Sequence, residues 1–273
     1  MDDLTIAESL ILKNNVVHVP ISERVLPDNF HARTGHNLIP ESSKVLEQIQ
    51  EIYDYVKTND MKLNMKKTKF MLFNHSKKYD FHPKCSLEGN DIELVEEMKI
   101  LGIIVTSNLK FNKNTDFMIK RAYKRMWMIR RLKNLGASNT QLKDIYIKQV
   151  RSVLEQCVPL WHPSLAQYET QNIERVQKAA LRIIYGQNYH SYNSACKAAN
   201  LLTLEVRRLD LCESFAKKSL KHPKHSKWFK LNAKATHTRQ KLPKFATPYS
   251  RTARFDNSPI PYLTGLLNKI YKS

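Results

Sequence analysis

The residues best suited to chemistry are two adjacent carboxylates at the start of the sequence, Asp2 and Asp3. Carboxylate oxygens are the ligands that hard divalent cations such as Mg²⁺ prefer, so this pair can contribute to a metal site. A run of alternating apolar residues follows the pair, which is typical of a strand. Two acidic residues are also common at an ordinary polar chain end. The elements around the pair must therefore decide between a metal site and an ordinary chain end.

An α+β block is expected over residues 1–110. Apolar residues at helical spacing, behind two serines that can cap a helix, predict a helix over residues 43–58. Extended segments are expected on both sides of it: a strand followed by irregular chain at 4–19, a strand at 68–73, a hairpin at 85–95 that turns at Gly89-Asn90, and a strand at 99–106. Gly102 interrupts the last strand, which indicates either a bulge or the close approach of a ligand to the backbone.

The pattern becomes helical from about residue 111. Apolar residues at 3.6-residue spacing predict three long helices that pack as a small bundle within residues 111–190. The first is marked from Phe117 and ends near Gly136, the second spans 138–154, and the third runs from about Glu169 to a stop at Gly186. Residues 191–273 are expected to hold shorter helices, near 191–200, 203–221 and 262–270. From Pro223 the intervening chain is basic and proline-rich, and the stretch 217–254 contains no acidic residue, so we expect a partly disordered arm there.

The net charge is the strongest signal about partners. Lys and Arg number 45 against 25 Asp and Glu, which gives a formal net charge of +20 and a pI of about 9.8. Such an excess favours a polyphosphate partner such as nucleic acid. No apolar run is long enough to predict a membrane span, and no basic amphipathic membrane anchor stands out.

The four cysteines are widely spaced and indicate reduced, mostly buried thiols. Cys212, His222 and His225 do not fit a zinc spacing.

A cluster of cations interleaved with aromatic side chains lies on the first long helix of the bundle. Its members are Lys120, Arg121, Lys124, Arg125, Arg130, Arg131 and Lys133, with Tyr123 and Trp127 among them. The spacing places several of these charges on one side of the helix, opposite apolar residues. Contact with the backbone of a nucleic-acid duplex is one interpretation, and an ordinary solvated helix face is the other.

Several further sequence features match one known family in chain order. They are Asp2-Asp3, Leu63-Asn64 with Lys66-Lys67-Thr68, Leu101-Gly102-Ile103, the landmarks Tyr146 and Trp161, Glu174-Arg175-Val176-Gln177-Lys178 with Leu181-Arg182, and Leu204-Glu205 with Arg207-Arg208. This order resembles the C-terminal half of a reverse transcriptase from a non-LTR retrotransposon of the LINE type, jockey-like. The resemblance covers nearly the whole chain.

The resemblance implies a fold and a reaction. Residues 1–110 would be part of the polymerase palm, made of a helix and short antiparallel strands. Residues 111–190 would be a thumb-like helical bundle, and 191–273 C-terminal helices and a basic, partly disordered arm. The family is an RNA-directed DNA polymerase that uses Mg²⁺, RNA template and primer DNA or RNA–DNA hybrid. Its aromatic-x-Asp-Asp hairpin would begin here at the x position, Met1. The earlier palm carboxylate and the fingers would then lie before Met1, in a missing N-terminal half, so the chain alone is expected to be inactive.

Roles follow for individual residues. Asp2 would ligate the metal directly and Asp3 would lie at the rim of the site, because adjacent strand residues face opposite ways. Lys67, or its neighbour Lys66, would neutralise the triphosphate, and Gly102 would lie in the strand pair that holds the primer end. The thumb would contact the duplex through Lys120, Arg121, Lys124, Arg125, Arg130, Arg131, Arg175, Lys178 and Arg182. The alternative is a non-catalytic protein that binds RNA or an RNA–DNA duplex through the same charges.

Overall fold

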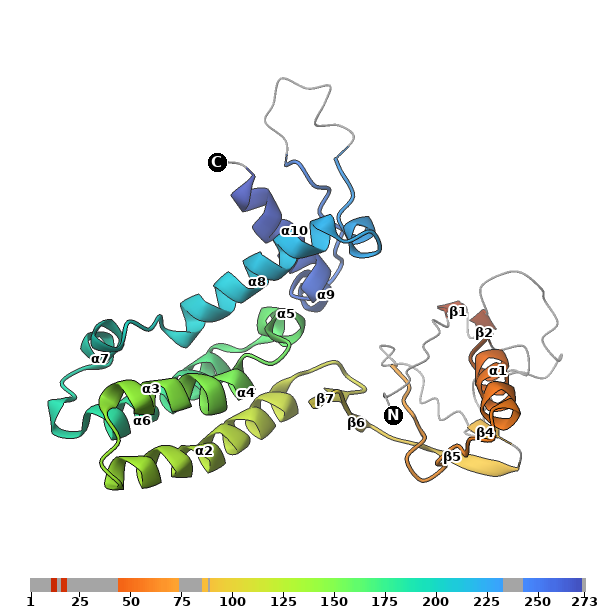
Figure 1. Cartoon of the computed structure of the whole chain (residues 1–273). Coiled ribbons are helices and arrows are strands. Elements are labelled where there is room, and N and C mark those ends of the chain that lie inside the picture. Colours follow the sequence, from red (N-terminus) through yellow and green to blue (C-terminus); the bar gives the residue numbers. More distant parts are fainter. Residues whose placement is uncertain are drawn as a thin grey trace, which may run out of the picture. The chain divides into compact units, whose positions relative to one another are not determined.

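The computed structural model describes residues 11–13, 16–18, 44–73, 85–87, 89–232 and 243–271. The chain separates into two compact units, residues 1–110 and 111–273 (Figure 1). The described residues form an α+β protein that is mainly helical with a few short strands, as the sequence predicts. None of the helices in these ranges is long and apolar enough to cross a membrane.

The first unit begins with a small antiparallel pair, β1 (Ile11–Lys13) and β2 (Val16–His18). The other residues of the strand and irregular chain predicted at 4–19 lie outside the described ranges. Helix α1 (Lys44–Thr58) matches the predicted helix within one residue. Its last turn is closed by the amide groups of Asn59 and Met61, which donate to carbonyls of Tyr55 and Val56.

A three-stranded sheet packs beside α1. Strands β4 (Cys85–Leu87) and β5 (Asn90–Leu94) form the predicted hairpin, with Gly89 at φ +75° in the turn. Strand β3 (Lys69–Phe70) is shorter than the predicted 68–73 and pairs with β5 in parallel, where antiparallel pairing was expected. The alternate residues Cys85, Leu87 and Ile92 are buried against Ile49, Tyr53, Leu63, Met65 and Phe70.

The predicted strand at 99–106 is instead a hairpin. Strands β6 (Glu97–Ile100) and β7 (Ile103–Thr106) pair in an antiparallel register that places Ile100 opposite Ile103. Leu101 and Gly102 are the two turn residues, with φ +48° and +85°. Positive φ at both central positions is the geometry of a type I′ turn. Gly102 therefore serves the turn, and neither the predicted bulge nor a ligand is needed to explain it.

The second unit begins with a bundle around the long helix α2 (Asn112–Asn134), which packs along α6 (Gln167–Tyr185). Between them, the predicted helix at 138–154 is divided into α3 (Asn139–Ile145), the π-helical segment η1 (Tyr146–Arg151) and α4 (Ser152–Leu154). Ser138 begins α3 through reciprocal hydrogen bonds with Gln141, which is a capping box. Two short pieces follow, α5 (Val158–Trp161) and the 3₁₀ turn η2 (His162–Ser164).

The remaining elements extend the same core. They are η3 (Gly186–Asn188), α7 (Tyr192–Ala199), α8 (Leu204–Lys221), the 3₁₀ turn η4 (His225–Trp228), α9 (Ala253–Asp256) and α10 (Pro259–Ile270). Helices α7, α8 and α10 contribute buried residues to one continuous cluster with α2 and α6. The predicted thumb segment 111–190 and the segment after it therefore share a hydrophobic core.

Part of the predicted disordered arm has a defined structure. Phe229 and Phe245 are both 4% exposed and belong to the core of the second unit. The backbone amide of Ala246 donates to the carbonyl of Lys230 at 2.9 Å, and the Asn268 side chain both accepts from and donates to the backbone of Phe245. Aromatic burial and these paired backbone groups offset the repulsion expected from the many cations of this stretch.

Candidate nucleic-acid interface

Helix α2 has one face in the core of the second unit. Met118, Ala122, Met126 and Ile129 follow one another at spacings of four, four and three residues, and all are at most 2% exposed. This spacing places their side chains in one line along the helix. The buried line fixes the rotation of α2, and with it the direction in which every other side chain of the helix points.

The opposite line of α2 carries exposed cations. Lys120, Lys124 and Arg131 lie at positions i, i+4 and i+11, and all three are exposed. At 1.5 Å per residue they extend over about 16 Å of helix. Trp127, 60% exposed, lies between them, and its ring is 5.7 Å from the Arg131 guanidinium carbon. We call Lys120, Lys124, Trp127 and Arg131 the α2 stripe. Arg130 is also exposed, on the flank of this line.

Two other cations of α2 are used inside the fold. The Arg125 guanidinium donates from Nη1 to the carbonyl of Gln149 at 2.7 Å, within η1. Lys133 donates from Nζ to the carbonyls of Ile183 and Ile184 at the end of α6. A cation at this position also interacts favourably with the negative end of the helix dipole. Arg121 is half-buried. The structure thus leaves Lys120, Lys124, Arg130 and Arg131 of the cluster exposed, while Arg125 and Lys133 bind backbone carbonyls.

Helix α6 presents a second set of cations. Arg175 and Arg182 are exposed and Lys178 is half-buried, and their spacing of three and four residues places them on one face. The Lys178 ammonium lies 5.1 Å from the ring centroid of Tyr192, and the Arg182 guanidinium lies 5.4 Å from that of Tyr189. These cation–π contacts hold the long side chains near the helix surface. We call Arg175, Lys178 and Arg182 the α6 set.

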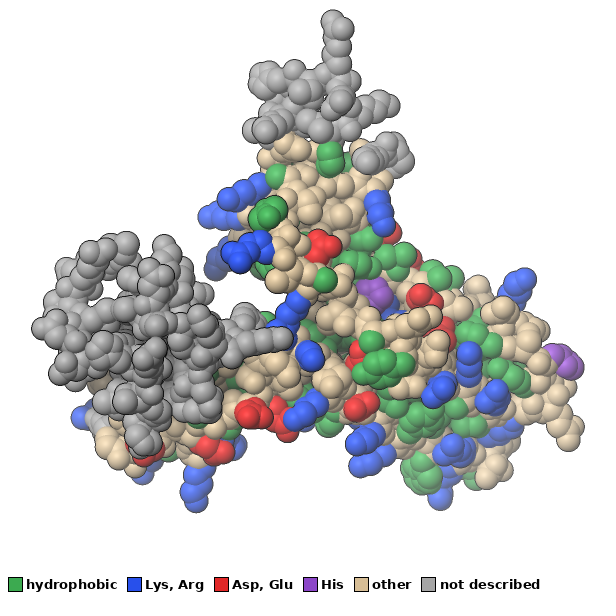
Figure 2. All heavy atoms as spheres, turned by 180° about the vertical axis from the view of Figure 1, so that it is seen from behind, with side chains coloured by type: hydrophobic (Ala, Val, Ile, Leu, Met, Phe, Trp, Pro, Cys, Tyr) green, Lys and Arg blue, Asp and Glu red, His purple; other side chains and the backbone are tan. Residues whose placement is uncertain are grey.

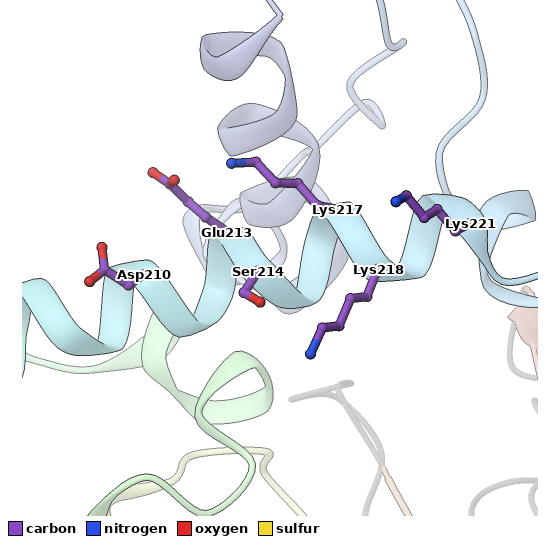
Figure 3. Close-up of a pocket in the computed structure, with 6 residues that line it drawn as sticks. All are labelled: Asp210, Glu213, Ser214, Lys217, Lys218 and Lys221. Carbon is purple, nitrogen blue, oxygen red and sulfur yellow. The ribbon is translucent and has the colours of Figure 1, made fainter.

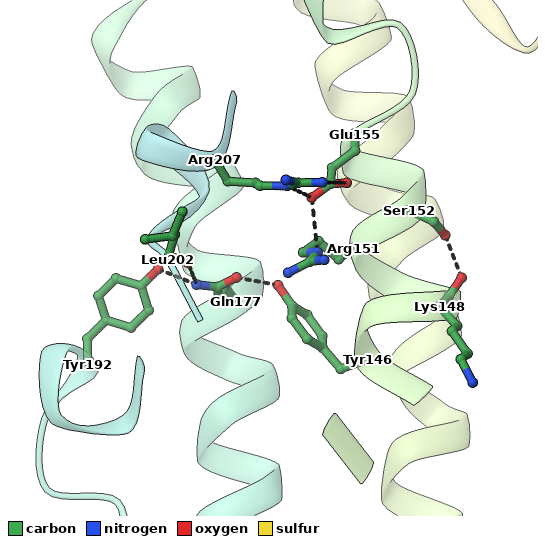
Figure 4. Close-up of polar contacts among 9 residues, drawn as sticks. All are labelled: Tyr146, Lys148, Arg151, Ser152, Glu155, Gln177, Tyr192, Leu202 and Arg207. Carbon is green, nitrogen blue, oxygen red and sulfur yellow. Dashed lines mark hydrogen bonds and ion pairs between the residues drawn. The ribbon is translucent and has the colours of Figure 1, made fainter. Parts of the chain in front are cut away.

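A buried polar network fixes α6 against η1 and the chain that follows α7 (Figure 4). The Tyr146 hydroxyl donates to Gln177 Oε1 at 2.6 Å, and Gln177 Nε2 donates to the Tyr192 hydroxyl and to the carbonyl of Leu202, both at 2.9 Å. Tyr192 in turn donates to Glu174 Oε1 at 2.7 Å. Burial raises the pKa of both tyrosines, so their hydroxyls remain proton donors. Glu174 and Gln177, noted in the sequence beside Arg175, thus position the helix that carries the α6 set.

A second polar contact joins α8 to the end of the η1 region. Arg207 donates from Nε and Nη2 to the two carboxylate oxygens of Glu155, at 2.9 and 3.3 Å, and Arg151 pairs with the same carboxylate at 3.0 Å (Figure 4). The fork of Arg207 matches the carboxylate geometry, which raises the strength of the contact. This bridge ties α8 to the bundle that displays the α2 stripe.

The surface of the second unit is rich in cations. Figure 2 shows Lys and Arg side chains spread over the helices, among hydrophobic ones, with acidic side chains fewer. An open hollow of about 370 Å³ follows α8 and is lined by Asp210, Glu213, Ser214, Lys217, Lys218 and Lys221 (Figure 3). All of its lining residues lie on one helix, so it is a surface groove with three lysines toward the C-terminal end of α8.

Of the three residues expected to carry chemistry, the structure describes one, Lys67. Asp2 and Asp3 lie outside the described residues. Lys67 is exposed in a turn, where its amide donates to the backbone carbonyl and side-chain oxygen of Asn64 at 3.0 and 3.2 Å. Within the ranges that the structure covers, no group of three or more His, Cys, Asp or Glu side chains could hold a metal ion. The fit of Mg²⁺ to the carboxylate pair thus stays an expectation from the resemblance.

The sequence interpretation missed two features of α8 and η4. Arg208 is 1% exposed, and its three guanidinium nitrogens have no hydrogen-bond partner among the described residues. Nothing in the sequence distinguishes it from its ion-paired neighbour Arg207. The second feature is a column of stacked rings made by His222, His225 and Trp228. Its sequence signal is the spacing of three residues, because side chains three apart, such as His225 and Trp228 of η4, lie above one another in a 3₁₀ turn.

Comparison with known proteins adds no relative to this geometry. No protein-family model matches the chain, and no curated protein or solved structure shows significant similarity to it.

Proposed function

We propose that the second unit of this chain binds the backbone of a nucleic-acid duplex, in the manner of the thumb of a reverse-transcriptase-like polymerase of a non-LTR retrotransposon. The observation that carries the proposal is the α2 stripe. Three exposed cations lie along a single helix face directly opposite the buried face, over about 16 Å. At about 3.4 Å of duplex axis per base pair, this length corresponds to the rise of about five base pairs.

The α6 set supports the same interpretation. Its cations come from a helix that packs along α2, and buried hydrogen bonds of Gln177 fix the rotation of that helix. Cations on rigid helices contact phosphates without reading base identity, so the expected ligand is a duplex of any sequence. An A-form RNA–DNA hybrid is the preferred form, since such duplexes are recognised by shape and backbone.

The catalytic part of the proposal rests on the resemblance alone. Asp2 and Asp3 would supply metal-binding carboxylates and Lys67 a charge near the triphosphate, within an RNA-directed DNA polymerase. The second candidate, a binder of RNA or hybrid duplex without chemistry, is favoured by the α2 stripe itself, because this stripe accounts for binding and needs no metal. Alanine at Asp2, Asp3 and Lys67 separates the two. A binder keeps its affinity for a primer–template duplex, whereas a polymerase reconstituted with the fingers and the earlier palm carboxylate loses metal-dependent primer extension.

The first experiment measures affinity for a fluorescein-labelled 20-base-pair RNA–DNA hybrid by anisotropy at several salt concentrations. A variant with Lys120→Gln, Lys124→Gln and Arg131→Gln is expected to bind at least tenfold more weakly at low salt. The slope of log affinity against log salt concentration should also become shallower, by roughly 0.7–0.9 for each phosphate that the variant no longer neutralises. The α6 variant, with glutamine at Arg175, Lys178 and Arg182, is expected to change in the same direction.

The matched control removes the same charge elsewhere. Lys57, Lys62 and Lys197 are exposed and lie outside both cation sets. The triple glutamine variant at these positions should keep most of the affinity and the salt slope of the native chain. An equal loss in the control, or binding that does not weaken with salt, would refute the proposal.

A further inference from the structure

The corner between α8 and η4 carries a column of three rings. The imidazoles of His222 and His225 are stacked with centroids 4.0 Å apart and planes 23° apart. The Trp228 indole continues the column, 4.4 Å from His225 with an interplanar angle of 15°. His225 and Trp228 begin and end the 3₁₀ turn η4, whose geometry places side chains three residues apart above one another. His222 lies before this turn, as the extended residue that ends α8. The column thus follows from the backbone at the end of α8 and in η4.

Backbone contacts hold this turn in place. The amide of Ser226 donates to the carbonyl of His222 at 2.9 Å, and the amide of Lys224 donates to Nδ1 of the His222 ring at 3.3 Å. Phe229, directly after Trp228, is 4% exposed and packs into the core. The rings are therefore ordered before any ligand arrives, which reduces the entropy cost of binding.

The column lies at the surface among cations. His222 is exposed and Trp228 is 40% exposed. Lys221, Lys224, Lys227 and Lys230 are all exposed and alternate with the ring residues along the chain. The whole stretch 217–254 contains no acidic side chain. Flat rings stacked in parallel, with exposed lysines between them along the chain, complement a ligand that offers flat rings and negative charge together.

We propose that His222, His225 and Trp228 form a stacking platform for the bases of single-stranded nucleic acid, with the adjacent lysines contacting its phosphates. An unpaired base extends the column by stacking on an exposed ring, as bases do on aromatic residues of single-strand-binding proteins. Bases inside a duplex have no free face, so this site is separate in ligand and in residues from the α2 stripe. The proposal therefore does not depend on duplex binding.

The experiment compares two labelled probes with equal backbone charge, a dT 12-mer and a 12-mer in which the central six sugars are abasic. Native protein is expected to bind the dT 12-mer at least tenfold more tightly. Trp228→Ala should remove this preference while leaving the affinity for the abasic probe unchanged, and Trp228→Phe should keep most of the preference. Tyr55→Ala, which removes an exposed aromatic ring of α1 outside both cation sets, is the matched control and should keep the preference in full.

His222→Ala gives a second variant at the other end of the column, where the ring is exposed and its removal leaves the core intact; it should lower the preference severalfold. Thermal unfolding of each variant establishes that it is folded. Equal native affinity for the two probes, or a preference that persists in folded Trp228→Ala and His222→Ala, would overturn the proposal. The proposal would also be overturned if binding to anionic lipid vesicles depended on Trp228 while the preference for the dT 12-mer over the abasic probe did not. These outcomes do not depend on duplex binding: the preference for the dT 12-mer is expected whether or not the glutamine variant of the α2 stripe loses affinity for the RNA–DNA hybrid.

Discussion

His162 illustrates how burial changes the chemistry of a single side chain. Its ring lies in η2, packs edge-on against Tyr262 at 5.6 Å, and its Nδ1 is buried without a hydrogen-bond partner among the described residues. Burial, together with the positive charge of Arg208, lowers the pKa of His162 from 6.5 to about 4. The folded state therefore disfavours the protonated ring, whereas the unfolded chain accepts the proton at its ordinary pKa.

This shift predicts a pH dependence of stability. Above pH 6.5 the ring is neutral in both states and has no effect. As the pH falls from 6.5 to about 4, the unfolded state gains a proton that the folded state rejects, so this group lowers stability by up to about 1.4 kcal/mol per pH unit. We expect His162→Gln to remove this contribution in chemical denaturation measured between pH 7 and 4. His190→Gln, at an exposed position, is the control; equal pH profiles for native protein and His162→Gln would contradict the prediction.

Helix α6 depends on how its C-terminal end is closed. Gly186 has φ +56°, and a Cβ atom at this position would come within 2.9 Å of Lys133 Nζ. That ammonium group cannot move away without weakening its hydrogen bonds to the last carbonyls of α6. A sequence rule for helix ends predicts glycine here, but the contact with Lys133 from the neighbouring helix is a property of the packing.

We expect Gly186→Ala to destabilise the second unit by about 1–3 kcal/mol, because alanine is strained at this φ whatever the neighbouring atoms do. Lys133→Met removes the crowding and the charge and should cost about 1–2 kcal/mol by itself. The double variant should therefore cost less than the sum of the two, as measured by urea denaturation, since the clash is absent from it. Gly265→Ala is the control, because Gly265 has open space around its Cβ position and lies within α10. Strict additivity of Gly186→Ala and Lys133→Met would show that the two positions do not interact.

The two units differ in the size of their cores. The second contains a continuous cluster of buried residues drawn from most of its helices. In the part of the first unit that the structure covers, the cluster has three buried members, Cys85, Leu87 and Ile92. Burial of apolar area is the main stabilising contribution to folding, so the second unit should be considerably more stable than the first.

We therefore expect residues 111–273 to fold when expressed without residues 1–110, with a cooperative thermal transition and the helical circular dichroism of the second unit. In the full chain, hydrogen exchange should protect amides of α2 and α6 at least tenfold more than amides of β4 and β5. A fragment that fails to unfold cooperatively, or equal protection of the two units, would show that the cores depend on one another.

Periodicity and turn chemistry in the sequence determined the helices and the hairpin at 85–95, because these depend on neighbouring residues along the chain. They failed where local signals are ambiguous. Gly102 in a run of β-branched residues is compatible with a strand or a two-residue turn, and the division of the helix at 138–154 by η1 leaves no mark in its apolar spacing.

The sequence by itself determined that this chain is α+β, strongly basic and suited to a polyanion, since composition sets charge whatever the fold. Only the tertiary structure decided how the cations are used. Lys120 and Arg125 look alike in sequence, yet the buried line of α2 turns one toward solvent and the other toward the Gln149 carbonyl. The same holds for the rings of His222 and Trp228, which the end of α8 and the 3₁₀ turn η4 bring into one column with His225. Side-chain roles of this kind depend on helix rotation and on contacts between distant segments, and a residue's type and local spacing do not contain that information.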